Sequence, residues 1–193
     1  MAKVHEVKHA RKAIPSAGIK VGDPYFWWKF MVGGRGGAKR VSKTYPRRSQ
    51  TTQSEFYAAV YDLEDRLADM KAENYETTDD LKSDLEDIAS EARALGEEQG
   101  EKFDNMPEGL RQGDTGQLLE ERRDACEAWA DELDAIEVEE VDEDAVATDL
   151  RTKAKDAGAD APTDEEIAGA VKEAIRDAVD AAISEAQQTS SPE

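Results

Sequence analysis

The chain has 193 residues and a net charge of −20, with 36% charged and 38% apolar residues. This length suits one medium domain or two small ones, and the apolar content is leaner than in a typical compact globule. The absence of a run of about eighteen apolar residues excludes a transmembrane helix, and the single cysteine, Cys126, excludes an intrachain disulfide. The basic N-terminus lacks the apolar stretch of a secretion signal.

Charge is distributed unevenly along the chain. Residues 1–50 contain 12 basic and 2 acidic side chains, a net charge of +10, whereas residues 51–193 contain 13 basic and 43 acidic side chains, a net charge of −30. This asymmetry suggests two surfaces with different partners. Adaptation to high salt is an alternative explanation, but the many Lys and Arg residues of the first segment argue against a uniform adaptation.

The first fifty residues have strand and turn signals. We expect an extended or flexible basic arm over residues 1–18, ending in a turn at 15–18. The sequence YFWWKFMV (25–32) then predicts a strand, followed by a glycine-rich turn over 33–37 and a return strand over roughly 38–45. Alternation along the first strand places Tyr25, Trp27, Lys29 and Met31 on one face and Phe26, Trp28, Phe30 and Val32 on the other.

The rest of the chain has the spacing of helices. Three segments repeat core positions every three or four residues, which is typical of helices packed side by side. These positions are Phe56, Val60, Leu63, Leu67 and Met70; then Leu81, Leu85, Ile88, Ala92 and Leu95; and finally Leu119, Arg122, Cys126, Trp129, Leu133 and Ile136. We expect helix starts at a capping box over 52–55, at Thr77 or Thr78, and near Thr115.

The second and third of these helices should form an antiparallel hairpin around the connector 104–116. The acidic stretch 137–162 is only weakly periodic. A last helix starts at a capping box over 163–166, and we expect the tail after it, QQTSSPE, to be disordered.

The predicted fold class is therefore α+β, with a small N-terminal β-hairpin module followed by a mainly α-helical antiparallel bundle or coiled coil. We expect three parts. They are a basic aromatic hairpin module with a flexible N-terminal arm (1–50), a three-helix antiparallel bundle (51–136), and an acidic, partly mobile helical extension and tail (137–193).

The hairpin module combines cations with flat rings, as a nucleic-acid-binding surface requires for phosphates and bases. The expected nucleic-acid or partner-binding residues are Tyr25, Trp27, Trp28, Lys29, Arg35, Lys39, Arg40, Lys43, Arg47 and Arg48. Two alternatives stay open. The rings could form a small core against the first helix, and the cations could bind acidic helices of this chain or of a neighbouring subunit.

Catalytic motifs are not found in the sequence. It lacks a Ser/His/Asp or HExxH arrangement, and GGRGG lacks the spacing of a phosphate-binding P-loop. His5 and His9 alone are too few ligands for a metal, and Cys126 is expected to be packed beside Trp129. We therefore expect no enzyme activity, no metal and no cofactor.

Three segments resemble a group of uncharacterised bacteriophage-encoded proteins that share the pattern GIKxGDxYxWWKF…SKTxPRxSQxT. They are ARKAIPSAGIKVGDPYFWWKF (10–30), SKTYPRRSQTTQSEFY (42–57) and ARALGEEQGEKFDNMPEGLRQGDTGQLLEERRDACEAWADEL (92–133). The resemblance implies a phage gene product that acts in the host cytoplasm or is carried in the virion.

The expected function is that of a non-enzymatic phage accessory protein. Its basic hairpin would bind nucleic acid or an acidic protein surface, and its helical body would mediate self-association or bind a host or phage protein. Two alternatives are a DNA-mimic inhibitor of a host defence or transcription protein, acting through the acidic helices, and a structural virion protein. No membrane partner is expected.

Overall fold

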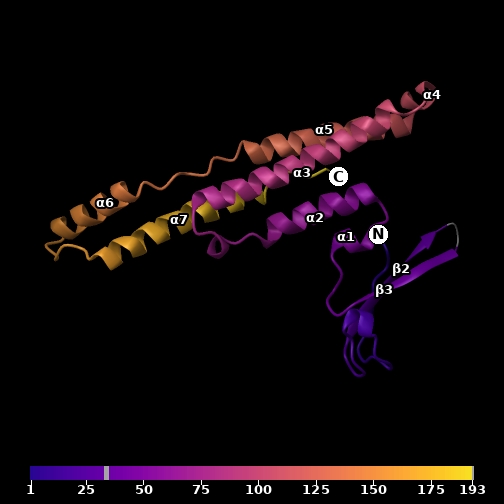
Figure 1. The fold of residues 1–193 in the computed structure, drawn as a ribbon, viewed down its shortest axis with the longest axis horizontal. Helices are drawn as coiled ribbons and strands as arrows, with labels where there is room; N and C mark the ends of the chain where they lie inside the picture. Colours follow the sequence, from indigo (N-terminus) through magenta and orange to yellow (C-terminus); the bar gives the residue numbers. More distant parts are fainter. Residues whose placement is uncertain (33–34, 193) are drawn as a thin grey trace. The chain divides into compact units, whose positions relative to one another are not determined.

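A computed structural model describes residues 1–32 and 35–192, without the side chains of residues 31, 32, 35, 36 and 38. A three-stranded antiparallel sheet at the N-terminus is followed by a largely helical body (Figure 1), which confirms the predicted α+β class. The chain divides into two compact units, Met1–Asp65 and Arg66–Glu193. Among the described residues no helix is long and apolar enough to cross a membrane.

The predicted hairpin is present in the N-terminal unit. Strand β2 (Tyr25–Val32) pairs antiparallel with β3 (Arg35–Ser42), with Trp28 opposite Arg40. The return strand begins and ends about three residues earlier than predicted. It ends at Ser42 because the Ser42 Oγ accepts the Thr44 N–H at 3.2 Å and turns the chain. Part of the predicted 33–37 turn, residues 33 and 34, lies outside the described residues.

The expected basic arm contributes a third strand, β1 (His5–Val7), which pairs antiparallel with β2. This strand has no signal in the sequence, because three residues are too few to show alternation. The predicted turn at 15–18 is confirmed as the short 3-10 helix η1 (Pro15–Ala17) and Gly18, whose φ of 65° suits glycine.

The first helices after the sheet begin at other residues than predicted. A short helix α1 (Arg48–Thr51) precedes α2 (Glu55–Asp69). The predicted capping box at Thr52 is wrong, because the Ser54 Oγ accepts the Tyr57 N–H at 3.3 Å and so caps α2 instead. All five predicted core positions from Phe56 to Met70 are buried.

In the C-terminal unit, α3 (Thr78–Asp104) and α5 (Asp114–Asp134) pack side by side (Figure 1). They run antiparallel, since Arg93 Nη2 lies 3.0 Å from Asp131 Oδ1 while Gly96 faces Cys126. The predicted start at Thr77 is confirmed, and its hydroxyl accepts the Asp80 N–H at 3.1 Å. The short helix α4 (Glu108–Arg111) lies within the predicted connector.

The close approach of α3 and α5 depends on Gly96, which has no side chain. A Cβ added at Gly96 would lie 3.1 Å from the Cys126 Cβ and 3.2 Å from the Arg123 carbonyl oxygen. These distances are tighter than ordinary van der Waals contact, so glycine allows α3 and α5 to pack closely here. Gly169 in α7 has nothing within 4 Å of such a Cβ, so no close approach requires glycine there.

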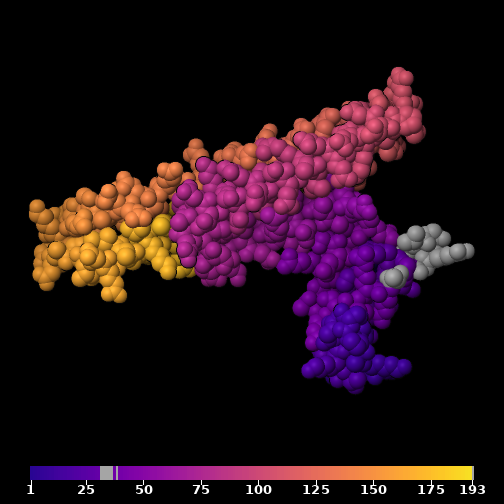
Figure 2. Space-filling model, viewed as in Figure 1, coloured from indigo at the N-terminus to yellow at the C-terminus, as the bar shows by residue number. Residues whose placement is uncertain are grey.

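Two further helices follow α5. The acidic stretch forms α6 (Glu143–Asp156), which begins where the Asp142 side chain accepts the Ala145 N–H at 3.0 Å. Helix α7 (Asp164–Ala186) starts at the predicted Thr163 capping box. Helices α6 and α7 lie side by side (orange and yellow in Figure 2), and the last turns of α7 contact α3 and η2 (Ala72–Asn74).

Residues 187–190 have defined contacts, contrary to the expectation of a disordered tail. Gln187 Nε2 donates to the Leu67 carbonyl at 2.9 Å, and the Ser190 N–H donates to Glu132 Oε2 at 3.0 Å. Thr189 Oγ1 accepts the indole N–H of Trp129 at 2.9 Å. A small polar tail has no local signal for order, and these non-local hydrogen bonds position it.

Cys126 is fully buried in the α5 seam, and burial raises the pKa of its thiol to about 11 from an ordinary value of 9.0. We therefore expect a thiol reagent to label Cys126 about a hundredfold more slowly in the native protein than in the urea-unfolded chain at pH 8. Equal labelling rates in the two states would contradict this burial.

The raised pKa of the Cys126 thiol also makes the stability depend on pH. Because the thiol ionises more easily in the unfolded chain, the free energy of unfolding should fall as the pH rises from about 9 towards 11.

Candidate nucleic-acid interface

The two adjacent tryptophans of β2 lie on opposite faces of the sheet, as the alternation predicts. We call the surface formed by His5, Tyr25, Trp27, Lys29 and Lys39 the Trp27 face. The opposite surface, formed by Phe26, Trp28, Phe30 and Arg40, is the Trp28 face. The two faces have different environments, and this difference divides the candidate residues.

The Trp28 face is packed. Trp28 is 3% exposed, and its indole N–H donates to the Gln50 carbonyl at 2.9 Å. Phe26 meets Tyr45 edge to face with ring centroids 5.4 Å apart, and the Arg40 guanidinium lies 5.3 Å from the Phe30 centroid. Trp28 therefore belongs to a small core, as the alternative reading of the aromatics expected, and its ring is not available to a base.

The Trp27 face combines three rings and two lysines from three strands. His5 on β1 stacks on Trp27 with centroids 4.3 Å apart and planes at 11°. From β3, the Lys39 ammonium lies 4.5 Å from the Trp27 centroid and 5.6 Å from that of Tyr25. Lys29 on β2 is opposite Lys39. All three rings are only partly buried, so flat surfaces and ammonium groups are presented together.

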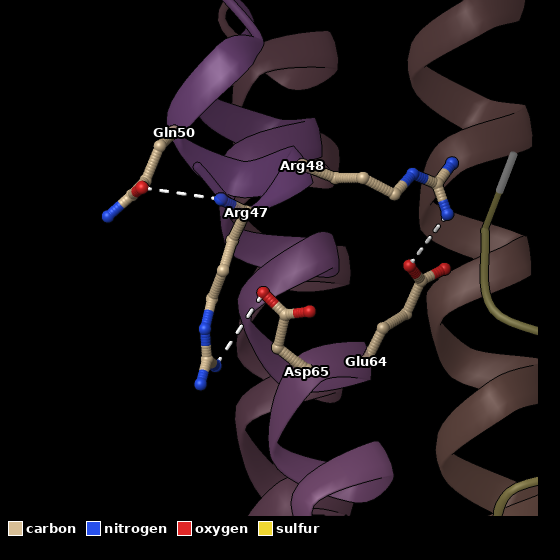
Figure 3. Close-up of polar contacts among 5 residues, drawn as sticks. All are labelled: Arg47, Arg48, Gln50, Glu64 and Asp65. Carbon is tan, nitrogen blue, oxygen red and sulfur yellow. Dashed lines mark hydrogen bonds and ion pairs between the residues drawn. The ribbon is translucent and has the colours of Figure 1, made fainter. Parts of the chain in front are cut away.

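Three of the expected phosphate-binding cations are paired with carboxylates of the same unit. Lys43 Nζ lies 3.5 Å from Asp23, and the Lys20 backbone N–H together with Lys43 lowers the pKa of that carboxyl. Arg47 reaches Asp65 at 3.7 Å and Arg48 reaches Glu64 at 3.2 Å, both on α2 (Figure 3).

The Arg48 guanidinium also lies 4.1 Å from the Tyr61 centroid. The carboxylates of α2 thus partly neutralise Arg47 and Arg48, as the alternative of binding to acidic helices of the same chain expected. Exposed ion pairs of this kind contribute only about 0.2–1 kcal/mol each, so the pairs orient these arginines more than they stabilise the fold.

Three other cations of the expected binding set are not paired with a carboxylate among the described residues. No carboxylate there lies within 4 Å of Lys29, Lys39 or Arg40. The side chain of Arg35 lies outside the described residues. Lys29 and Lys39 are the two unpaired cations on the Trp27 face, so that face has both the rings and the charge needed to bind an anionic, aromatic ligand.

His5 was not among the residues expected in the binding surface, because its sequence position relates it only to His9, as a partial metal site. No group of three or more metal-binding side chains occurs among the described residues. Its place on Trp27 follows from the pairing of β1 with β2, which has no signature in the sequence.

Comparisons with protein-family models, with curated proteins and with solved structures found no match to this chain.

Proposed function

We propose that this protein is a non-enzymatic accessory protein that binds single-stranded nucleic acid on the Trp27 face. The observation that supports this most is the juxtaposition of His5, Trp27 and Tyr25 with Lys29 and Lys39, which have no carboxylate partner among the described residues. Rings on a protein surface stack on bases that are not already stacked in a duplex, which favours a single strand.

Lys39 is the side chain that has to move for a base to reach Trp27. A cation–π contact at an exposed site contributes about 0.5–1 kcal/mol, whereas stacking of a base on an aromatic side chain contributes about 1–3 kcal/mol. The exchange is therefore favourable, and the displaced ammonium is then within reach of the phosphate next to that base. Ring and cation thus act on adjacent parts of one nucleotide.

Charge restricts binding to the N-terminal unit. Residues 1–65 carry a net charge of +6 and residues 66–193 a net charge of −26. The C-terminal unit, called the helical unit from here on, therefore repels a phosphate backbone. In the infected bacterium that the phage resemblance implies, the helical unit binds a protein partner or a second copy of the chain.

Salt dependence of binding tests this proposal. A fluorescent single-stranded oligonucleotide is titrated with the protein at several salt concentrations, and binding is followed by anisotropy. For single strands the logarithm of the affinity falls with the logarithm of salt by about 0.7 for each phosphate neutralised. The variant Lys39→Gln should flatten this slope by about that amount, whereas Lys12→Gln, an exposed cation that is not one of the residues of this face, should leave it unchanged. No binding at low salt would overturn the proposal.

A further inference from the structure

A cavity of about 530 Å³ opens beside the Trp27 face in the N-terminal unit. Its lining includes Lys3, His5, Lys29, Phe30, Thr52 and Ser54. The volume falls within the range of about 300–1,000 Å³ that is usual for small-ligand pockets. His5 and Lys29 belong both to this cavity and to the Trp27 face, so a ligand lying on that face can continue into the cavity.

The chemistry of the lining favours a phosphate. The antiparallel register that pairs His5 with Trp27 brings Lys3 towards Lys29. Among the described residues, neither lysine has a carboxylate within 4 Å, and none of those lining the cavity is acidic. Two ammonium groups without a counter-charge attract a dianionic phosphate more strongly than the single charge of a phosphodiester.

One wall of the cavity is formed by the N-terminal segment and the residues between α1 and α2. The Ala2 N–H donates to the Thr51 carbonyl at 2.6 Å, which ties the N-terminal segment to the junction between α1 and α2. The hydroxyls of Thr52 and Ser54 lie on this wall and accept backbone N–H groups, and each hydroxyl also has an O–H group that can donate to an acceptor such as a phosphate oxygen. A strand end that enters the cavity from the Trp27 face meets two lysines and two hydroxyl groups.

We infer that the cavity binds the terminal phosphate monoester of a single strand whose adjoining bases lie on the Trp27 face. This inference rests on the proposed function and adds recognition of a strand end to it. The two candidate sources of such a group are a 5′-phosphate and a 3′-phosphate.

Competition binding distinguishes these ends. Three unlabelled strands of one sequence, with a 5′-phosphate, a 3′-phosphate or two hydroxyl ends, compete for the full-length protein against a labelled strand. We expect one phosphorylated strand to bind about three- to tenfold more tightly than the strand with hydroxyl ends. The preference should disappear in the variant Lys3→Gln with Lys29→Gln. It should persist in Lys8→Gln with Lys12→Gln, a charge-matched control whose two lysines are exposed and lie outside the cavity.

Two results would overturn the inference while the proposed function stands. One is equal affinity of the wild-type protein for all three strands. The other is a phosphate preference that survives loss of Lys3 and Lys29. Both of these lysines are exposed, so the variant is expected to fold, and circular dichroism verifies this. Absence of binding by every strand is a different outcome, which would overturn the proposed function together with the inference.

Discussion

Replacing Trp129 by alanine should lower the free energy of unfolding of the helical unit by about 3–5 kcal/mol, the cost of deleting a large buried aromatic side chain. Trp129 is 1% exposed in the seam of α5, and its indole N–H is bonded to Thr189. The ring therefore holds both the α3–α5 hairpin and the end of the chain in place. Urea unfolding followed by circular dichroism measures the change.

A matched control lies on the same helix. Leu118 is 39% exposed, so Leu118→Ala should change stability by no more than about 0.5 kcal/mol. Thr189→Val removes the hydrogen bond from the indole and the one that the Thr189 hydroxyl donates to the Ala186 carbonyl, and should cost about 1–2 kcal/mol. If Trp129→Ala and Leu118→Ala had equal effects, the packing of Trp129 described above would be wrong.

The adjacent tryptophans of β2 should respond to substitution in opposite ways. Trp27→Ala removes a stacking surface and should weaken binding of single-stranded nucleic acid by about 5- to 150-fold, the equivalent of about 1–3 kcal/mol, while the sheet stays folded. Trp28→Ala leaves a cavity and the Gln50 carbonyl without its donor, so it should destabilise the N-terminal unit by about 3 kcal/mol or more.

Anisotropy titration and thermal unfolding of both variants separate the two effects. Trp28→Ala is titrated well below its unfolding temperature, where it should bind close to the wild-type level. Equal losses of affinity in the two folded variants would show that the Trp27 face is not the binding surface.

Local signals were enough to predict most of the helical body. The heptad-like spacing identified the seams of α3 and α5, and Thr77 and Thr163 marked helix starts because a cap requires only the first turn of the helix. Strand β1 and the ordered tail depend instead on partners far along the chain, such as Trp27 for His5 and Leu67 for Gln187. A single sequence carries no record of such pairings.

The candidate site could be predicted only in part for the same reason. Alternation separated Trp27 from Trp28, but which of them faces the core depends on the Gln50 carbonyl, 22 residues away from Trp28. Arg47 and Arg48 were expected to be phosphate contacts, and the structure pairs them with Asp65 and Glu64 of α2. Charge counting could not distinguish these cations from Lys29 and Lys39.

Site-resolved photo-cross-linking shows directly whether nucleic acid binds on the Trp27 face. A single strand containing 5-iodouracil is irradiated with the full-length protein, and the modified residues are identified by mass spectrometry. We expect cross-links at Trp27 or Tyr25, and none at Trp28 or in residues 66–193. Cross-links confined to residues 66–193, or located at Trp28, would contradict binding on the Trp27 face.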